Sequence, residues 1–189
     1  MIDEVIEEMV RGLTEMVRNP DLEPFERGCY RRTRLMLERA RDGLPFTNDD
    51  LEVVRSMATD PRVFAEKPDD PEGLEQHAQI VGLVARNCDP REPTNLRAVL
   101  LGRAERYRAL ARIQRGEVTT RETFCDLVEG LLLTSARDAD GKPPAPEHRR
   151  RHAQKVAALY EKTCPDMTWE ARCQRYITAL DELCRNSSG

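Results

Sequence analysis

The sequence predicts an all-α protein, built as two consecutive four-helix bundles joined by a short proline-rich linker. Three observations support this fold class. Apolar residues recur at the spacing of one helix face through most of the chain. Prolines and glycines separate these stretches, and no segment shows the alternation typical of a strand. The 189 residues are enough for one domain or two small ones.

Four helices are expected in the first half of the chain. The second begins near Pro24, because proline suits a first helical turn, and Gly43 lies beyond its end. The third follows Thr47, with Asp50 three residues later at the spacing of a capping box. The apolar spacing predicts helices over residues 2–18, 24–42, 47–57 and 71–88.

A segment from Cys88 to Thr94, with two prolines and three charged residues, predicts the domain boundary. The expected domains are therefore residues 1–88 and 94–185. Gly116 stops the fifth helix, and Thr119 with Glu122 predicts a capping box for the sixth. The helices expected in this second half cover residues 94–115, 119–132, 147–163 and 168–183.

Arginine dominates the cations, with 26 arginines against 4 lysines, while the net charge is only −4. Attraction to anions must therefore come from local patches, and the planar guanidinium group suits phosphate and carboxylate. The charge is segregated: residues 1–26 hold eight acids against two arginines, and residues 91–115 hold seven arginines against two glutamates. Such segregation attracts polyanions locally, or pairs one copy's acidic bundle with a neighbour's basic bundle.

Helical projection gathers the arginines on faces opposite the apolar ones, with Phe25 on the apolar side of the second helix. The alternative interpretation is a set of solvated faces with i,i+4 salt bridges. No motif for reading bases is present, so we expect contact with phosphate, either RNA backbone or anionic lipid headgroups. The candidate anion-binding residues are Arg27, Arg31, Arg34, Arg41, Arg97, Arg108, Arg112, Arg115, Arg149, Arg150 and Arg151.

No signature of an enzyme is found, and neither a metal nor a cofactor is expected. His148 and His152 share a helix face at a spacing that can bind zinc, but no acid or cysteine accompanies them at a recognisable spacing. The six cysteines form no Cys-x-x-Cys pair and are expected to be small buried apolar residues. The acidic, amphipathic N-terminus is unlike a signal or transit peptide, which favours the cytosol or nucleus.

A segment of about forty residues, Gly116 to Val156, carries three motifs: Gly-Glu-Val-Thr-Thr from Gly116, then Phe124, then His-Arg-Arg-Arg-His from His148 followed by Ala-Gln-Lys-Val. In these motifs the segment resembles the middle region of orthomyxovirus matrix proteins. This chain lacks the Cys-x-x-Cys pair that members can carry ahead of the histidines, keeping only Cys125. A zinc-binding role is therefore in doubt.

The resemblance implies an all-helical, two-bundle viral matrix protein that lines the inner membrane face of a virion and is made in the host cytoplasm or nucleus. Such a protein would self-associate into a layer and contact anionic lipid headgroups, the ribonucleoprotein or RNA backbone through its arginine faces. His148 and His152 become candidates for pH sensing, because histidine gains a proton near pH 6.5. Their protonation beside Arg149–Arg151 is expected to add repulsion and loosen an oligomeric contact.

The main alternative is a cytosolic all-helical adaptor that binds a protein partner. A small helical enzyme or regulator is a third possibility. Composition and residue spacing do not distinguish among these three functions.

Overall fold

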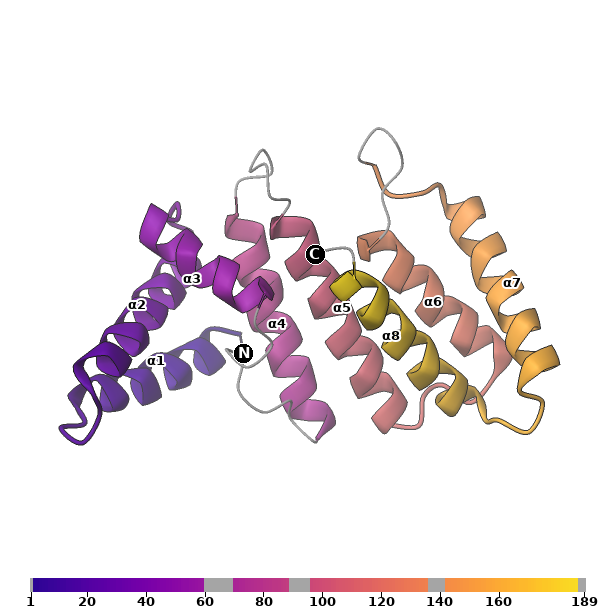
Figure 1. Cartoon of the computed structure of the whole chain (residues 1–189), viewed down its shortest axis with the longest axis horizontal. Helices are drawn as coiled ribbons and strands as arrows, with labels where there is room; N and C mark the ends of the chain where they lie inside the picture. Colours follow the sequence, from indigo (N-terminus) through magenta and orange to yellow (C-terminus); the bar gives the residue numbers. More distant parts are fainter. Residues whose placement is uncertain (1, 60–69, 89–95, 136–141, 187–189) are drawn as a thin grey trace. The chain divides into compact units, whose positions relative to one another are not determined.

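The computed structural model describes residues 2–59, 70–88, 96–135 and 142–186, and the described residues form eight α-helices without a strand. The all-α prediction is confirmed for this part of the chain (Figure 1). The helices are α1 (Ile2–Arg18), α2 (Pro24–Arg41), α3 (Asn48–Thr59), α4 (Pro71–Asn87), α5 (Leu96–Gln114), α6 (Arg121–Ser135), α7 (Pro146–Thr163) and α8 (Trp169–Asn186).

The helices form two compact units. The chain passes from one unit to the other within α4 and again within α5. The first unit contains α1, α2, α3, α4 from Gln76 and α5 through Ala104. The second contains the start of α4, the rest of α5, and α6, α7 and α8. Leu74, in the first turn of α4, is fully buried in the second unit's core, which explains why the start of α4 belongs to that unit. The predicted linker runs from Cys88 to Thr94, and its residues 89–94 lie outside the described residues, so the boundary between domains 1–88 and 94–185 stays a prediction.

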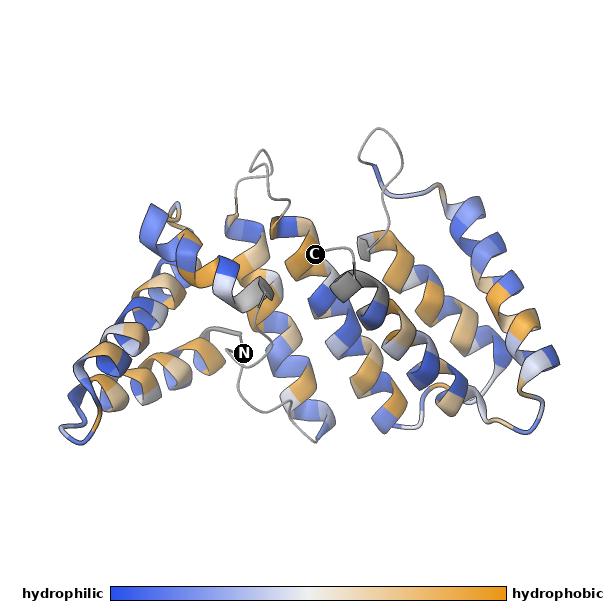
Figure 2. Cartoon of the chain, in the orientation of Figure 1, coloured by the Kyte–Doolittle hydropathy of each residue, from blue (hydrophilic) through white to orange (hydrophobic). Residues whose placement is uncertain are grey.

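In the first unit, α1 and α2 lie side by side and α2 also packs on α3 (Figure 1). The capping box predicted for α3 is confirmed: the Thr47 backbone N–H donates to Asp50 Oδ2 at 2.7 Å, and the Asp50 N–H donates back to Thr47 Oγ1 at 3.2 Å. Arg39 of α2 lies 3.4 Å from the same carboxylate, which is 6% exposed. Asn87 links the end of α4 to α2 by donating to the Ala40 carbonyl at 3.2 Å. Polar contacts thus fix the ends of helices whose apolar sides form the core (Figure 2).

In the second unit, Phe124 is fully buried at the centre of the apolar core. Its ring centroid lies 6.0 Å from that of Tyr160, 5.3 Å from Trp169 and 6.4 Å from Tyr176. These distances are typical of aromatic clusters, which stabilise a core beyond simple area burial. Phe124 therefore joins α6 to both α7 and α8.

The turns of the second unit show one correction to the sequence analysis. Gly116, with φ of 69°, ends α5 as predicted, since this left-handed conformation suits glycine. The predicted pairing of Thr119 with Glu122 is wrong by one residue: Thr120 and Thr123 cap α6 instead. The backbone N–H of each donates to the hydroxyl of the other, at 3.1 and 3.2 Å, because α6 begins only at Arg121.

Arg172 holds the turn between α7 and α8. Although charged, it is only 5% exposed, and it donates to the carbonyls of Cys164 at 2.9 Å and Pro165 at 3.1 Å. Its guanidinium carbon lies 4.3 Å from the Trp169 ring centroid, a cation–π contact. This arginine satisfies carbonyls beyond the end of α7, so its role is structural.

Replacing Phe124 by Ala is expected to lower the free energy of unfolding by about 3–5 kcal/mol, because a buried ring is lost and a cavity remains. Urea unfolding followed by circular dichroism measures the change. Leu159→Ala, at a side chain 58% exposed, is the control and should change stability by less than about 0.5 kcal/mol. Equal losses in the two variants would contradict the assigned core.

Candidate anion-binding surfaces

The exposed side of α2 combines two arginines with two apolar residues. We call this set the α2 face: Phe25, which is 77% exposed, Arg31, Arg32 and Leu35, which is 39% exposed. Within the described residues, no carboxylate lies within ion-pair distance of Arg31 or Arg32. Arg32 makes only a weak contact of 3.6 Å with the Cys29 sulfur. The face therefore presents two guanidinium groups that have no carboxylate partner in the part of the chain that the structure describes.

The α2 face differs from the arginine stripe expected there. Arg31 is exposed, and Arg27 is half-buried without an ion pair to any described residue. Arg34 lies 3.7 Å from Glu38, and Arg41 lies 2.8 Å from Asp42. The hydrogen bond from Arg41 lowers the pKa of Asp42, so this pair stays ionised. Two of the four arginines predicted on this helix, Arg34 and Arg41, are thus paired with carboxylates.

Phe25 is a second correction on α2, since the sequence placed it on the buried side. Its large exposure follows from where burial occurs: the fully buried residues of α2, Met36, Leu37 and Ala40, all lie in the last two turns. Phe25, in the first turn, lies on the same side of the helix as Met36 but stays 77% exposed. Arg32 is exposed too, although it was not among the residues predicted from the sequence.

The arginines at the end of α5 are paired with carboxylates of their own unit. Arg108 contacts Glu105 and lies 3.9 Å from Glu75, and Arg115 lies 3.9 Å from the other oxygen of Glu75. Arg112 lies 3.4 Å from Glu117. These three arginines thus have carboxylates close by, supplied by α4, by α5 itself and by the turn after α5, and their role in anion binding stays a prediction. Arg97, earlier in α5, is half-buried and has no ion pair within the described residues.

An exposed basic stripe runs along α7. It joins His148, Arg151 and His152 of the predicted set to three residues that the sequence analysis missed, Lys155, Leu159 and Lys162. At about 100° per residue, all six project within a sector of roughly 100°. The cations of the stripe form no ion pair with described residues, and its one apolar member, Leu159, is 58% exposed. The first turns of α7 are accordingly hydrophilic in Figure 2.

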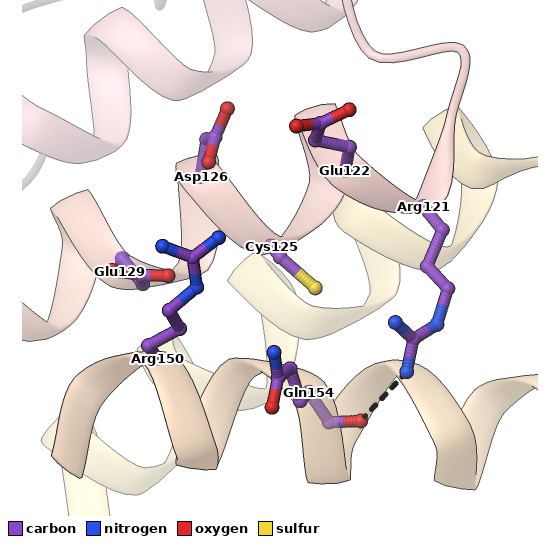
Figure 3. Close-up of a pocket in the computed structure, with 7 residues that line it drawn as sticks. All are labelled: Arg121, Glu122, Cys125, Asp126, Glu129, Arg150 and Gln154. Carbon is purple, nitrogen blue, oxygen red and sulfur yellow. Dashed lines mark hydrogen bonds between the residues drawn. The ribbon is translucent and has the colours of Figure 1, made fainter. Parts of the chain in front are cut away.

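Arg149 and Arg150 do not belong to this α7 stripe. Arg149 is half-buried and donates to the Pro144 carbonyl before α7. Arg150 reaches toward α6, where it lines a hollow of about 300 Å³ with Glu122, Asp126 and Glu129 (Figure 3). Arg121 closes the other end by donating to the Gln154 carbonyl at 3.5 Å (Figure 3). The three consecutive arginines predicted to bind anions together, Arg149 to Arg151, thus point in three different directions.

Cys125 lies at the bottom of the hollow, 8% exposed, and burial raises the pKa of its thiol. In the core, burial raises the pKa of Cys173 to about 12. Both groups are therefore neutral thiols at physiological pH, which disfavours a nucleophilic role. Cys88 is buried too, whereas Cys29 and Cys164 are half-buried; the side chain of Cys184 lies outside those described. Among the described residues, no three histidine, cysteine or acidic side chains gather as metal ligands.

Comparison with protein-family models, with curated proteins and with solved structures gives no match for this chain. Of the helices described, none has the length and apolar content needed to span a bilayer. The surfaces above must therefore be interpreted from their own chemistry.

Replacing Glu75 by Gln should release Arg115, while Arg108 keeps its contact with Glu105, and should strengthen binding to a polyanion. The salt dependence of binding to a single-stranded RNA oligonucleotide should steepen by about 0.7 in log–log slope, as one phosphate contact is added. Glu72→Gln makes the same charge change in the first turn of α4, at a carboxylate with no arginine pair among described residues. Equal behaviour of the two variants would show that Glu75 does not hold Arg115.

Proposed function

We propose that this chain is a non-enzymatic structural protein, resembling a viral matrix protein, that self-associates into a layer beneath a membrane. The proposal includes two four-helix bundles, a place in the virion against the inner membrane face, and contact with anionic lipid headgroups or ribonucleoprotein. The α2 face is the observation that carries it. A free arginine pair beside exposed apolar residues fits the headgroup region of an anionic membrane better than bulk water.

The contribution of each group can be estimated. A cation near an anionic bilayer surface contributes about 1 kcal/mol, so Arg31 and Arg32 together supply about 2 kcal/mol. Phe25 adds an apolar term if its ring enters the boundary between headgroups and acyl chains. These energies support reversible contact by one copy, and a layer of many copies would bind more tightly because its contacts are linked.

Phe25 favours lipid over RNA as the main anionic partner. RNA backbone is contacted through charge, whereas only a bilayer offers apolar volume directly beneath its phosphates. The exposed aromatic ring also supports the alternative, a cytosolic adaptor, because aromatic and arginine side chains are enriched at protein–protein interfaces. A protein partner needs no lipid, and binding to vesicles separates the two proposals.

The variant Arg31→Glu, Arg32→Glu should weaken binding to phosphatidylserine vesicles by at least about 30-fold, the equivalent of about 2 kcal/mol. Vesicle co-sedimentation at low salt measures it. The matched control, Arg86→Glu with Arg175→Glu, makes the same charge change at exposed positions outside the α2 face and should keep most binding. Wild-type protein that does not sediment with these vesicles would contradict the membrane proposal.

Phe25→Ser distinguishes the lipid from RNA in the same assay. Loss of the ring should weaken vesicle binding by about tenfold or more, since burial of a phenylalanine contributes about 1.5–3 kcal/mol. Binding to an RNA oligonucleotide should be unchanged. A loss on RNA equal to that on vesicles would favour a nucleic-acid surface, and no loss on either would remove Phe25 from the contact.

A further inference from the structure

The outward side of α1 carries acids at the spacing at which α7 carries cations. Glu4, Glu8 and Glu15 are exposed on one side of α1, with Gly12 among them. The only ion pair to Glu8 that the described residues show is Arg11 at 3.7 Å, with both side chains at least 70% exposed. Exposed pairs of this kind contribute less than about 1 kcal/mol, so Glu8 can exchange its partner. No ion pair to Glu15 occurs within the described residues.

The spacing on the two helices is the same, residue for residue. Glu4, Glu8 and Glu15 are separated by four and seven positions, and so are Arg151, Lys155 and Lys162. Residues with these separations lie on one side of a helix, spread over about 16 Å of its axis. Two such helices laid parallel would place each carboxylate opposite a cation.

The apolar member of the α7 stripe fits the same alignment. Leu159 is the eighth residue after Arg151, and Gly12 is the eighth after Glu4. A Cβ atom on Gly12 would meet nothing within 4 Å, so the surface above this glycine is open. A leucine that is 58% exposed thus has an uncovered stretch of backbone to pack against.

We propose that α7 of one copy lies parallel to α1 of a second copy, pairing Arg151 with Glu4, Lys155 with Glu8 and Lys162 with Glu15, with Leu159 over Gly12. This proposal rests on the proposed function, because it supplies the contact by which the layer assembles. The occupant of the α7 stripe is therefore a second copy of this chain. Charge complementarity selects it, and the matched spacing sets its register.

The contact is heterologous, since it joins two different surfaces of the chain. Such contacts extend from copy to copy unless a rotation closes them into a ring. Each added copy presents another free α7 stripe and another acidic side of α1. A one-dimensional row of copies follows, and the contact uses none of the residues of the α2 face.

The pairing also reverses the sign of the pH response expected from the sequence. His148 and His152 flank Arg151 on the α7 stripe, and across the contact they lie near Glu4 and Glu8. Protonation gives each histidine a positive charge, which would lie close to these glutamates. Acidification should then strengthen assembly in the wild type and leave a His148→Gln, His152→Gln variant unchanged. If acidification weakened the assembly of the wild type but not that of the variant, the α7 stripe would face another basic surface.

A charge exchange tests the contact without lipid, by sedimentation velocity at low salt. Wild-type protein should form species that grow with concentration. The variants Lys155→Glu with Lys162→Glu, and Glu8→Lys with Glu15→Lys, should each remain monomeric, because their two surfaces have the same sign. An equimolar mixture should co-assemble, and so should one chain that carries all four changes. Arg86→Glu with Arg175→Glu is the control and should assemble as the wild type does.

Monomeric wild type, or a mixture that stays monomeric while both variants are folded by circular dichroism, would overturn the contact. Loss of vesicle binding in Lys155→Glu, Lys162→Glu, together with a monomeric wild type, would assign the stripe to lipid instead. The two tests are independent. The charge exchange can support the contact between copies even if the α2 face does not bind vesicles, and the α2 face can bind vesicles even if the charge exchange fails.

Discussion

Ion pairing within the chain decides which of its many arginines can meet an outside partner. Arg108, Arg112 and Arg115 lie within ion-pair distance of Glu75, Glu105 and Glu117, so the fold itself supplies partners for their charge. Arg31 and Arg32 on α2 and the cations of α7 lack such carboxylates among the described residues. The same composition therefore yields one internal network and two free surfaces, and the proposed contacts depend on that division.

Local chemistry explains what the sequence predicted well. The eight helices, the cap of Thr47 with Asp50 and the stop at Gly116 all depend on residues near one another in the chain. The α6 cap differs by one residue because two threonines compete for the same role. The α7 stripe could also have been predicted from the sequence, since projection of residues 146–163 at the helical angle brings its six members together.

Tertiary contacts explain what the sequence could not predict. Glu75 meets Arg108 and Arg115 across more than thirty residues, and no local pattern indicates that meeting. Phe25 repeats the apolar spacing of α2, but only the structure shows that its turn is uncovered. Charge on a helical projection thus identifies candidates, and the position of carboxylates from other helices determines which remain free.

Residue-by-residue modification with phenylglyoxal, read by mass spectrometry, tests this division most directly. Free guanidinium groups react readily, whereas ion-paired ones are protected. The account predicts fast modification at Arg31, Arg32 and Arg151, slow modification at Arg108 and Arg115, and slowing at Arg31 and Arg32 when phosphatidylserine vesicles are added. Equal rates at all five arginines, or vesicle protection confined to Arg108 and Arg115, would contradict it.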